Sequence, residues 1–163
     1  MVVAGILLNA GDQVLIADRA RSTSMQDFWE FPGGKVNDGE SNESALRREL
    51  AEELDIRVTA AEHFHFLEHR YPDLHVAIDF YIVSGWNGEP TGQEGQQLKW
   101  VPRQSLSDQR LLPADAPIIE LLARRDTKTP LGYGAAGTSS VGLPCQLGSL
   151  NCRTDGLAAG ALE

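Results

Sequence analysis

Three glutamates, Glu49, Glu52 and Glu53, are spaced so that a helix would carry them on one side. At about 100° per residue, Glu52 and Glu53 fall roughly 60° and 40° to either side of Glu49. Leucines at four-residue spacing form a neighbouring stripe that would pack such a helix against a core. Clustered carboxylates repel each other unless a cation lies among them. Hard cations such as Mg²⁺ take oxygen ligands and often bridge carboxylates to phosphates, so the cluster suits such an ion.

A solvated helix with exposed ion pairs, such as Arg48 with Glu52, is the alternative interpretation of this segment. The preceding loop favours the metal site, because it contains two adjacent glycines, Gly33 and Gly34. Glycine permits unusual backbone angles and the close approach of a ligand. A glycine loop followed by a helix with clustered carboxylates therefore indicates chemistry rather than a plain surface helix.

The segment from Gly34 to Ile56 resembles the Nudix box, whose pattern is G-x5-E-x7-R-E-U-x-E-E-x-G-U with U apolar. The positions that fit are Gly34, Glu40, Arg48, Glu49, Leu50, Glu52, Glu53 and Ile56. So many fixed positions in one window make a chance match very unlikely. One position departs, because Asp55 stands where the pattern has Gly. Asp tolerates the left-handed conformation that often ends a helix, so we expect a small stability cost and no loss of chemistry.

The resemblance extends beyond the box, over roughly residues 2–122. Segments 71–75, 88–90, 94–96 and 113–117 are similar in order and spacing to MutT-type Nudix hydrolases. Those enzymes remove oxidised guanine nucleotides, notably 8-oxo-dGTP, from the nucleotide pool. The box implies cleavage of a diphosphate linked to another group, with Mg²⁺ or, in its place, Mn²⁺. A Nudix hydrolase for another diphosphate and a nucleotide-binding module without turnover are the alternatives; modules of that kind usually lack the box glutamates.

The resemblance implies roles for the charged residues of the box. Glu52 and Glu53 are expected metal ligands. Glu49 is either a third ligand or the group that orients or deprotonates the attacking water, which places it with Glu53 among the catalytic residues. Arg48 joins them as the partner expected to orient Glu49 through an ion pair. Glu40 has a similar supporting role.

Other ligands and phosphate contacts are expected around the loops. The Gly33 carbonyl is a candidate metal ligand, because the loop must bring backbone close to the ion. Glu94 occupies a position where MutT relatives carry an acid that reaches the metal, although an ordinary loop acid is an equal alternative. Gly34 and Lys35 are candidate phosphate contacts, with a solvent-facing lysine as the alternative. Arg19 matches a basic residue that lies near the nucleotide in MutT relatives.

Asp115 is the most informative departure near the expected base pocket. MutT relatives place Asn or Asp there, and an Asn both donates and accepts, so it pairs with O6 and N7–H of 8-oxoguanine together. An ionised Asp only accepts and cannot donate to O6 unless it is protonated. A plain helix cap before Pro117 is the alternative role for Asp115. Phe31, Tyr71 and Asp73 are further candidates for the pocket, with core packing as the alternative for the two aromatic residues.

Composition limits the classes of function. The chain of 163 residues suits one domain with a core, and its net charge of −9 argues against nucleic-acid binding. Metal bound by acidic ligands reconciles that charge with a phosphorylated substrate. No apolar run is long enough to span a membrane, and residues 1–8 lack the features of a signal peptide. Cys145 and Cys152 lie outside the candidate site. We expect a cytoplasmic monomer acting on a small-molecule nucleotide.

Hydrophobic alternation and turn residues predict strands over 2–9, 13–17, 63–69, 74–83 and 98–101. The first two are expected to form a hairpin, and the next two to pair across the turn at 71–73. Residues 85–97 are expected to form a Gly-rich loop.

One helix is expected to begin after a Ser41 cap and run to about Leu54, and another to run from Asp115 or Ala116 to Arg125. Propensity alone predicts mixed α/β structure, and the resemblance implies the Nudix α/β/α sandwich with a mixed β-sheet between helices. Residues 1–125 would form this domain. Residues 126–163 are rich in Gly, Ser and Ala without a period, which predicts a disordered tail.

Overall fold

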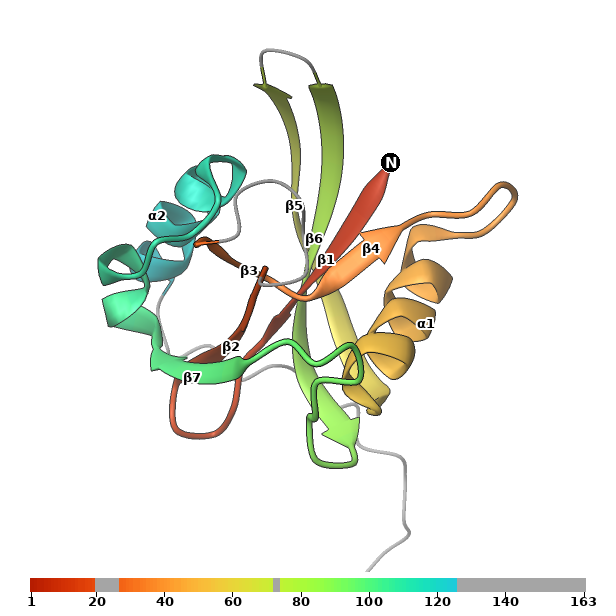
Figure 1. Cartoon of the computed structure of the whole chain (residues 1–163), viewed down its shortest axis with the longest axis horizontal. Coiled ribbons are helices and arrows are strands. Elements are labelled where there is room, and N and C mark those ends of the chain that lie inside the picture. Colours follow the sequence, from red (N-terminus) through yellow and green to blue (C-terminus); the bar gives the residue numbers. More distant parts are fainter. Residues whose placement is uncertain (20–26, 72–73, 126–163) are drawn as a thin grey trace, which may run out of the picture. The chain divides into compact units, whose positions relative to one another are not determined.

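The computed structural model describes residues 1–19, 27–71 and 74–125. Its elements are β1 (Val2–Leu7), β2 (Gln13–Asp18), β3 (Trp29–Glu30), β4 (Gly33–Lys35), α1 (Asn42–Leu54), β5 (Arg57–Tyr71), β6 (Leu74–Asn87), β7 (Leu98–Pro102), the 3-10 helices η1 (Arg103–Asp108) and η2 (Pro113–Asp115), and α2 (Ala116–Arg124). Their order along the chain is followed by colour in Figure 1.

The strands form two sheets. The larger has the order β4-β1-β6-β5, and the smaller has the order β3-β2-β7. β1 pairs in parallel with β6 and antiparallel with β4. β5 and β6 pair antiparallel through their whole length and form the long ribbon in Figure 1. The larger sheet is therefore mixed, as expected.

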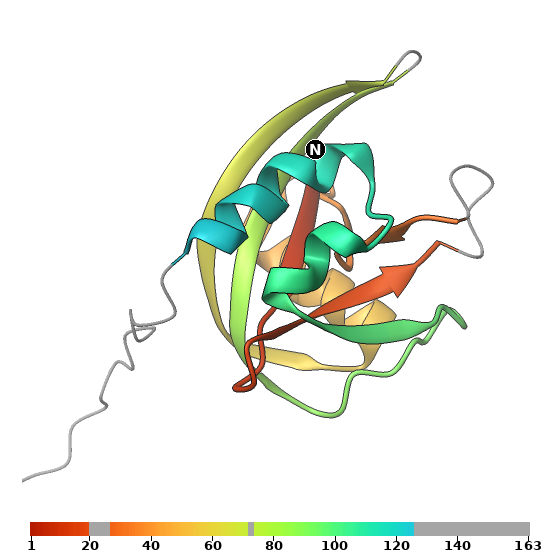
Figure 2. The same ribbon diagram turned by 90° about the vertical axis from the view of Figure 1, so that its left-hand side faces the viewer.

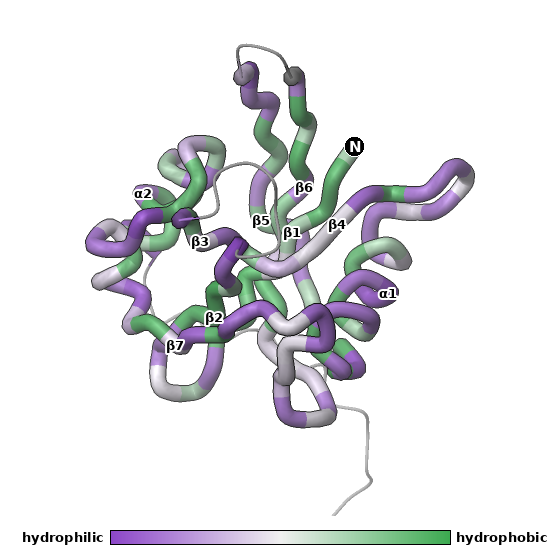
Figure 3. Tube along the Cα trace, viewed as in Figure 1, coloured by the Kyte–Doolittle hydropathy of each residue, from purple (hydrophilic) through white to green (hydrophobic). Residues whose placement is uncertain are grey.

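Helices α1 and α2 lie on opposite sides of the larger sheet (Figures 1 and 2). Alternate residues of β1 explain this arrangement, because successive side chains of a strand point to opposite faces. Val3 and Leu7 belong to the core cluster that contains the leucines of α1. Ala4 and Ile6 belong to the cluster that contains the buried residues of α2. β1 carries hydrophobic colour at its N-terminal end in Figure 3, whereas α1 is mixed. The α/β/α sandwich is confirmed.

The expected hairpin over 2–9 and 13–17 is wrong. Both ranges form strands, but β1 and β2 belong to different sheets and share only the bridge between Leu8 and Val14. The turn itself is tight, since the Asn9 side chain accepts hydrogen bonds from the backbone of Gly11 and Gln13. β1 pairs instead with β6, and β2 with β7.

The ribbon of β5 and β6 is longer than expected. β5 begins at Arg57 rather than His63, and β6 continues through 85–87, which were expected to be loop. Register shifts in the first part of β5 break the regular alternation that would mark it as a strand. η1 was also missed, as short 3-10 turns have little periodic signal.

Both ends of α1 are as expected. The Ser41 hydroxyl accepts a hydrogen bond from the backbone N–H of Ser44, which caps the helix. Asp55 ends the helix in the left-handed region, with φ 56°, and its N–H donates to the Ala51 carbonyl. Asp55 thus adopts the conformation for which the family pattern uses Gly.

Residues 126–163 lie outside the described residues, so the expected tail stays a prediction, as does the domain boundary at 125. None of the helices in the described parts of the chain is both long and apolar enough to cross a membrane.

Candidate active site

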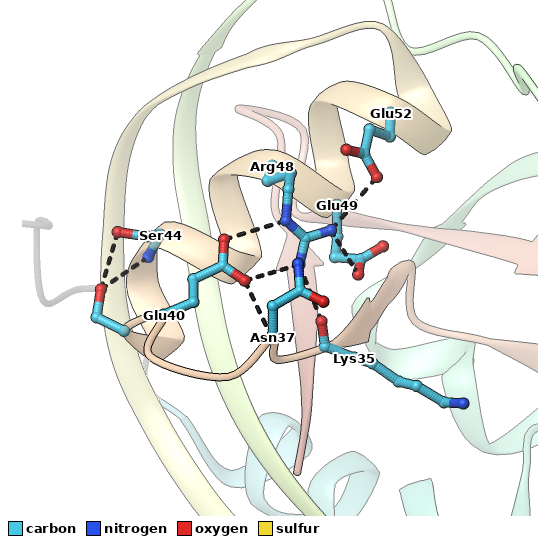
Figure 4. Close-up of polar contacts among 8 residues, drawn as sticks. Lys35, Asn37, Glu40, Ser44, Arg48, Glu49 and Glu52 are labelled. Atoms are coloured by element: carbon cyan, nitrogen blue, oxygen red, sulfur yellow. Dashed lines mark hydrogen bonds and ion pairs between the residues drawn. The ribbon is translucent and has the colours of Figure 1, made fainter.

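Arg48 organises the solvent-facing side of α1 (Figure 4). Its guanidinium donates to both carboxylate oxygens of Glu40, at 3.0 and 2.8 Å, and to Glu49 at 2.8 Å. It also donates to Glu52 at 3.3 Å and to the Lys35 carbonyl at 2.9 Å. The hydrogen bonds from Arg48 lower the pKa of Glu40, and the same carboxylates raise the pKa of Arg48. This network ties the loop to α1 and fixes the orientation of Glu49, as expected.

The two glycines allow the loop to pack between β1 and α1. A Cβ on Gly34 would lie 2.3 Å from the Glu49 carboxylate. Gly33 has φ +153°, and a Cβ there would lie 2.1 Å from the Val3 carbonyl oxygen. No side chain fits at Gly33, where the obstacle is backbone, whereas a side chain at Gly34 would displace the Glu49 carboxylate.

A pocket of about 220 Å³ opens beside the loop, next to the last turn of α1. It is lined by Ala17, Asp18, Arg19, Glu30, Pro32, Glu53, Glu94 and Gln96. Half of these are acids, and Arg19 is the one base among the described lining residues. Arg19 forms an ion pair with Glu30, whose pKa is raised by burial despite that pair. The pocket therefore carries an excess of negative charge.

Glu53 is the most perturbed acid of the pocket. The backbone N–H of Gly33 donates to its Oε2 at 3.0 Å. The pKa of Glu53 is raised to about 7, mainly by burial, with the Gly33 hydrogen bond acting to lower it and the negative charges of Glu94, Glu30 and Glu49 acting to raise it. Burial of the charged form of this carboxylate costs free energy, which is why the pKa rises.

The oxygen donors of the pocket fit a hard divalent cation, which would offset the repulsion around Glu53. Among the described residues, no group of three His, Cys, Asp or Glu side chains converges closely enough to hold a metal ion. The reason is visible in the Arg48 network, because Arg48 binds Glu49 and Glu52 on the outer side of α1. For all the predicted glutamate ligands to bind one metal ion, the side chains of Glu49 and Glu52 must therefore rotate away from Arg48.

Asp115 is buried, with 4% of its surface exposed, and its Oδ2 receives no hydrogen bond from any described residue. The alternative role as a helix cap is not supported, because Asp115 stands at the N-cap position of α2 but its side chain makes no capping hydrogen bond. The pKa of Asp115 is raised to about 8, mainly by burial, with the charge of Glu30 also raising it and that of Arg19 lowering it. Asp115 is therefore a neutral carboxylic acid near pH 7, with a donor as well as an acceptor.

The other expected site residues lie in several places. Arg19, Glu53 and Glu94 line one pocket. Phe31 is buried in the core, edge-to-face with Phe80, and Tyr71 packs partly buried against the same cluster, with its hydroxyl at the Ala114 backbone N–H.

Lys35 is exposed, and its ammonium points away from the Arg48 network in Figure 4. Lys35 does not line the pocket, whereas its carbonyl helps to hold Arg48. Asp73 lies outside the described residues, so its expected role stays a prediction.

Three polar lining residues were not expected: Asp18, Glu30 and Gln96. Glu30 had a weak signal, because it is an acid between two aromatic residues, Trp29 and Phe31, and strand alternation turns it to the opposite face. Asp18 and Gln96 had no such signal, because the end of β2 is brought to the segment before β7 by hydrogen bonds between Asp18 and Gln97.

A model of the NUDIX domain matches residues 1–122. The 8-oxo-dGTP diphosphatase of Escherichia coli is 38% identical over 123 residues, covering 76% of this chain and 95% of that protein. The CTP pyrophosphohydrolase of Escherichia coli is 34% identical over 119 residues, covering 73% and 87%. A solved MutT structure, described for Aliivibrio salmonicida and Vibrio cholerae, is 36% identical with a TM-score of 0.66, covering 77% of this chain and 96% of that one.

This chain belongs to the Nudix family. It is a Nudix hydrolase with the fold of its MutT-like neighbours. Enzymes of this family act on small nucleotide substrates and need a divalent metal, in agreement with the excess negative charge of the pocket.

Proposed function

We propose that this enzyme hydrolyses 8-oxo-dGTP to 8-oxo-dGMP and pyrophosphate with Mg²⁺, which Mn²⁺ can replace. The observation that carries the proposal is the pocket in which the buried carboxylate of Glu53 faces Glu94 and Arg19. The diphosphatase of Escherichia coli, related over most of this chain, supports the choice of substrate. The role in a cell would be to clear a mutagenic precursor from the cytoplasmic nucleotide pool, and so to avoid errors in DNA replication.

We assign the metal to Glu53, Glu52, Glu94 and the carbonyl of Gly33. Glu53 is already in the pocket, and the Gly33 backbone lies against it. Glu52 is exposed and holds Arg48 through the longest of the four carboxylate contacts of that network, so its release costs little. When bound, Mg²⁺ supplies positive charge for the phosphates and activates the attacking water.

Glu49 and Arg48 act on the water. Arg48 holds one oxygen of Glu49, which lies against Gly34. The other carboxylate oxygen is available to orient the water or to take its proton as a bridging P–O bond breaks and pyrophosphate leaves. Gly34 and Lys35 would contact the phosphates from the loop.

We assign recognition of the base to Asp115, with Arg19, Phe31, Tyr71 and Asp73 around the nucleotide. A neutral Asp115 donates to O6 and accepts from N7–H of 8-oxoguanine, as an Asn would. Ordinary guanine has a bare N7 acceptor and makes only one of the two bonds. Leaving a buried polar group unpaired costs about 1–3 kcal/mol, which corresponds to roughly 10- to 100-fold discrimination.

A substrate panel tests the proposal. The enzyme is incubated with Mg²⁺ and equal amounts of 8-oxo-dGTP and dGTP, and rates and products are measured. We expect the oxidised nucleotide to be preferred, with pyrophosphate and a monophosphate as products. Equal rates, or release of inorganic phosphate instead of pyrophosphate, would refute the proposal.

Hydrolysis of another nucleoside triphosphate is the second candidate, favoured by the similarity to a CTP pyrophosphohydrolase. A pyrimidine has no N7 edge, so Asp115 would gain no paired hydrogen bonds from it. CTP in the same panel separates the two candidates: a kcat/KM higher for CTP than for 8-oxo-dGTP would replace the first assignment with the second.

A further inference from the structure

The segment from Gly88 to Gln97 is bound to the C-terminal end of α1. Helix ends leave carbonyl groups without partners inside the helix. Here Thr91 N–H donates to the Leu54 carbonyl, and Gln93 N–H donates to the Glu53 carbonyl, both at 2.9 Å. The segment, called the loop below, therefore takes its position from the same helix turn that carries Glu53.

The Gln96 side chain adds a second connection between the loop and the last turn of α1. Its Nε2 donates to the Glu53 carbonyl at 3.2 Å, and its Oε1 accepts from the Glu94 backbone N–H at 2.9 Å. One planar amide thus joins the backbones of two residues whose carboxylates line one pocket. The amide supplies the donor and the acceptor together, whereas an ionised carboxylate in its place would accept at both ends.

The carboxylates of Glu53 and Glu94, the two residues that the Gln96 amide joins, repel each other. The charge of Glu94 is one of the causes that raise the pKa of Glu53. A Gly-rich loop gains backbone entropy when it detaches, so repulsion and entropy both favour movement of Glu94 away from Glu53. The Gln96 amide opposes both effects.

We propose that Gln96 is a positioning residue that holds Glu94 beside Glu53 and thereby sets the affinity of the site for its divalent metal. The inference rests on the proposed function in one respect, the assignment of Glu53 and Glu94 to the metal. It does not depend on which nucleotide is hydrolysed.

Two variants of Gln96 and one matched control test it. Gln96→Ala removes both hydrogen bonds, and Gln96→Glu keeps the shape but loses the donor to the Glu53 carbonyl. Gln93→Ala is the control, because the Gln93 side chain bonds only within the loop, to Thr91, while its backbone bond to Glu53 remains. Thermal unfolding of each variant shows whether the domain is still folded.

Mn²⁺ binding is measured by electron paramagnetic resonance without nucleotide. We expect both Gln96 variants to bind Mn²⁺ about tenfold more weakly, as loss of a group supporting metal ligands typically does, and Gln93→Ala to bind as the wild type does. In the metal-free proteins, the Glu94 amide should exchange its hydrogen faster in Gln96→Ala only. Unchanged Mn²⁺ affinity in folded Gln96→Ala would overturn the proposal.

A double-mutant cycle with Glu94→Gln separates positioning from general damage to the fold. If Gln96 acts through Glu94, Gln96→Ala has no further effect on Mn²⁺ affinity once Glu94 is Gln. An additive loss would overturn the inference. Because the titration contains no nucleotide, it decides on Gln96 even if 8-oxo-dGTP is not hydrolysed, and the substrate panel decides on the proposed function separately.

Discussion

Two groups of acids lie on and beside α1, and they differ in how their charge is balanced. In the first group, Glu40, Glu49 and Glu52 share the guanidinium of Arg48, and the pKa of Glu40 is lowered. In the second group, Glu53 faces further acids across the pocket, and its pKa is raised to about 7. Residues adjacent in sequence thus have opposite electrostatic environments.

The difference indicates a division of roles. The Arg48 network contains its own cation, so its geometry is fixed before any ligand arrives. The pocket has an excess of negative charge, which a proton on Glu53 or an added cation would offset. A preformed, balanced network beside an unbalanced pocket is the arrangement expected when one part orients groups and the other binds a metal.

The largest effect is expected from Glu53→Gln, which removes the charge at the centre of the unbalanced group. Turnover should fall by about three orders of magnitude, on the scale of losing one group that stabilises charge in the transition state. The fold should persist, because the change removes a buried charge and does not leave another buried charge without its partner. Rates are measured at saturating Mg²⁺, and thermal unfolding is followed in parallel.

Glu43→Gln is the matched control for that variant, since Glu43 is an exposed acid on the same helix and pairs with Arg47. Its turnover should stay near that of the wild type. A Glu53→Gln enzyme with a near-normal rate would contradict the assignment of the pocket to the metal.

A smaller loss is expected from Arg48→Lys, which disturbs the balanced group while keeping its charge. A single ammonium cannot hold both oxygens of Glu40 and also Glu49, so the orientation of Glu49 is relaxed. We expect kcat to fall about 10- to 100-fold with little change in the KM of the nucleotide. Arg47→Lys, next to it on α1, should change neither value. An equal loss in both variants would show that the helix, and not Glu49, had been damaged.

The sequence was sufficient to predict the group of acids around Arg48. It was insufficient for several residues of the group around Glu53. Spacing along one helix was enough to place Glu49, and Ser41 was recognisable as its cap, whereas the roles of Arg48 and Asp55 were implied by the resemblance to the Nudix box. Glu30 and Gln96 enter the pocket through contacts with residues far away in the chain. Such contacts leave no period in the sequence, because they depend on which strands pair.

Contacts between distant parts of the chain also explain why the predicted hairpin is wrong and why Asp115 does not cap α2 with its side chain. The turn between β1 and β2 was visible locally, but the partners β6 and β7 that separate the two strands follow much later in the chain. Asp115 has the residue type and position of a helix cap, yet the surrounding core buries its side chain. Local preference yielded to tertiary packing in both cases.

A moderate effect is expected from Asp115→Asn, which replaces a buried acid that belongs to neither group but whose pKa is also raised. The pKa of Asp115 is about 8 in the folded state, against about 3.9 in an unfolded chain, so the folded state binds the extra proton between these values. Stability of the wild type therefore falls as the pH rises from about 4 to 8. The variant lacks this loss, and its advantage in the free energy of unfolding should grow over the same range, at up to about 1.4 kcal/mol per pH unit.

The same variant tests base recognition. Asn keeps both a donor and an acceptor, so preference for 8-oxo-dGTP over dGTP should persist at pH 7, with activity within a few-fold of the wild type. Above pH 8 the wild type should lose preference as Asp115 ionises, and Asp115→Asn should not. Urea unfolding at pH 5 and 8 checks the stability, and kcat/KM ratios at pH 7 and 9 check the recognition. Parallel pH profiles for the two proteins would contradict the neutral-acid role.

The smallest effect is expected at two aspartates that share a left-handed conformation but differ in charge balance. Asp55 and Asp12 have φ 56° and 57°. Asp55→Gly relieves backbone strain and removes an anion from a helix C-terminus, while the unfolded chain gains entropy, so we expect about 0.5 kcal/mol of stabilisation without a change in rate. Asp12→Gly should do the opposite, by about 2 kcal/mol, because it leaves the guanidinium of Arg103, only 5% exposed, without its carboxylate. Urea unfolding of both variants measures the difference, and stabilisation in both would show that backbone strain, and not ion pairing, governs these turns.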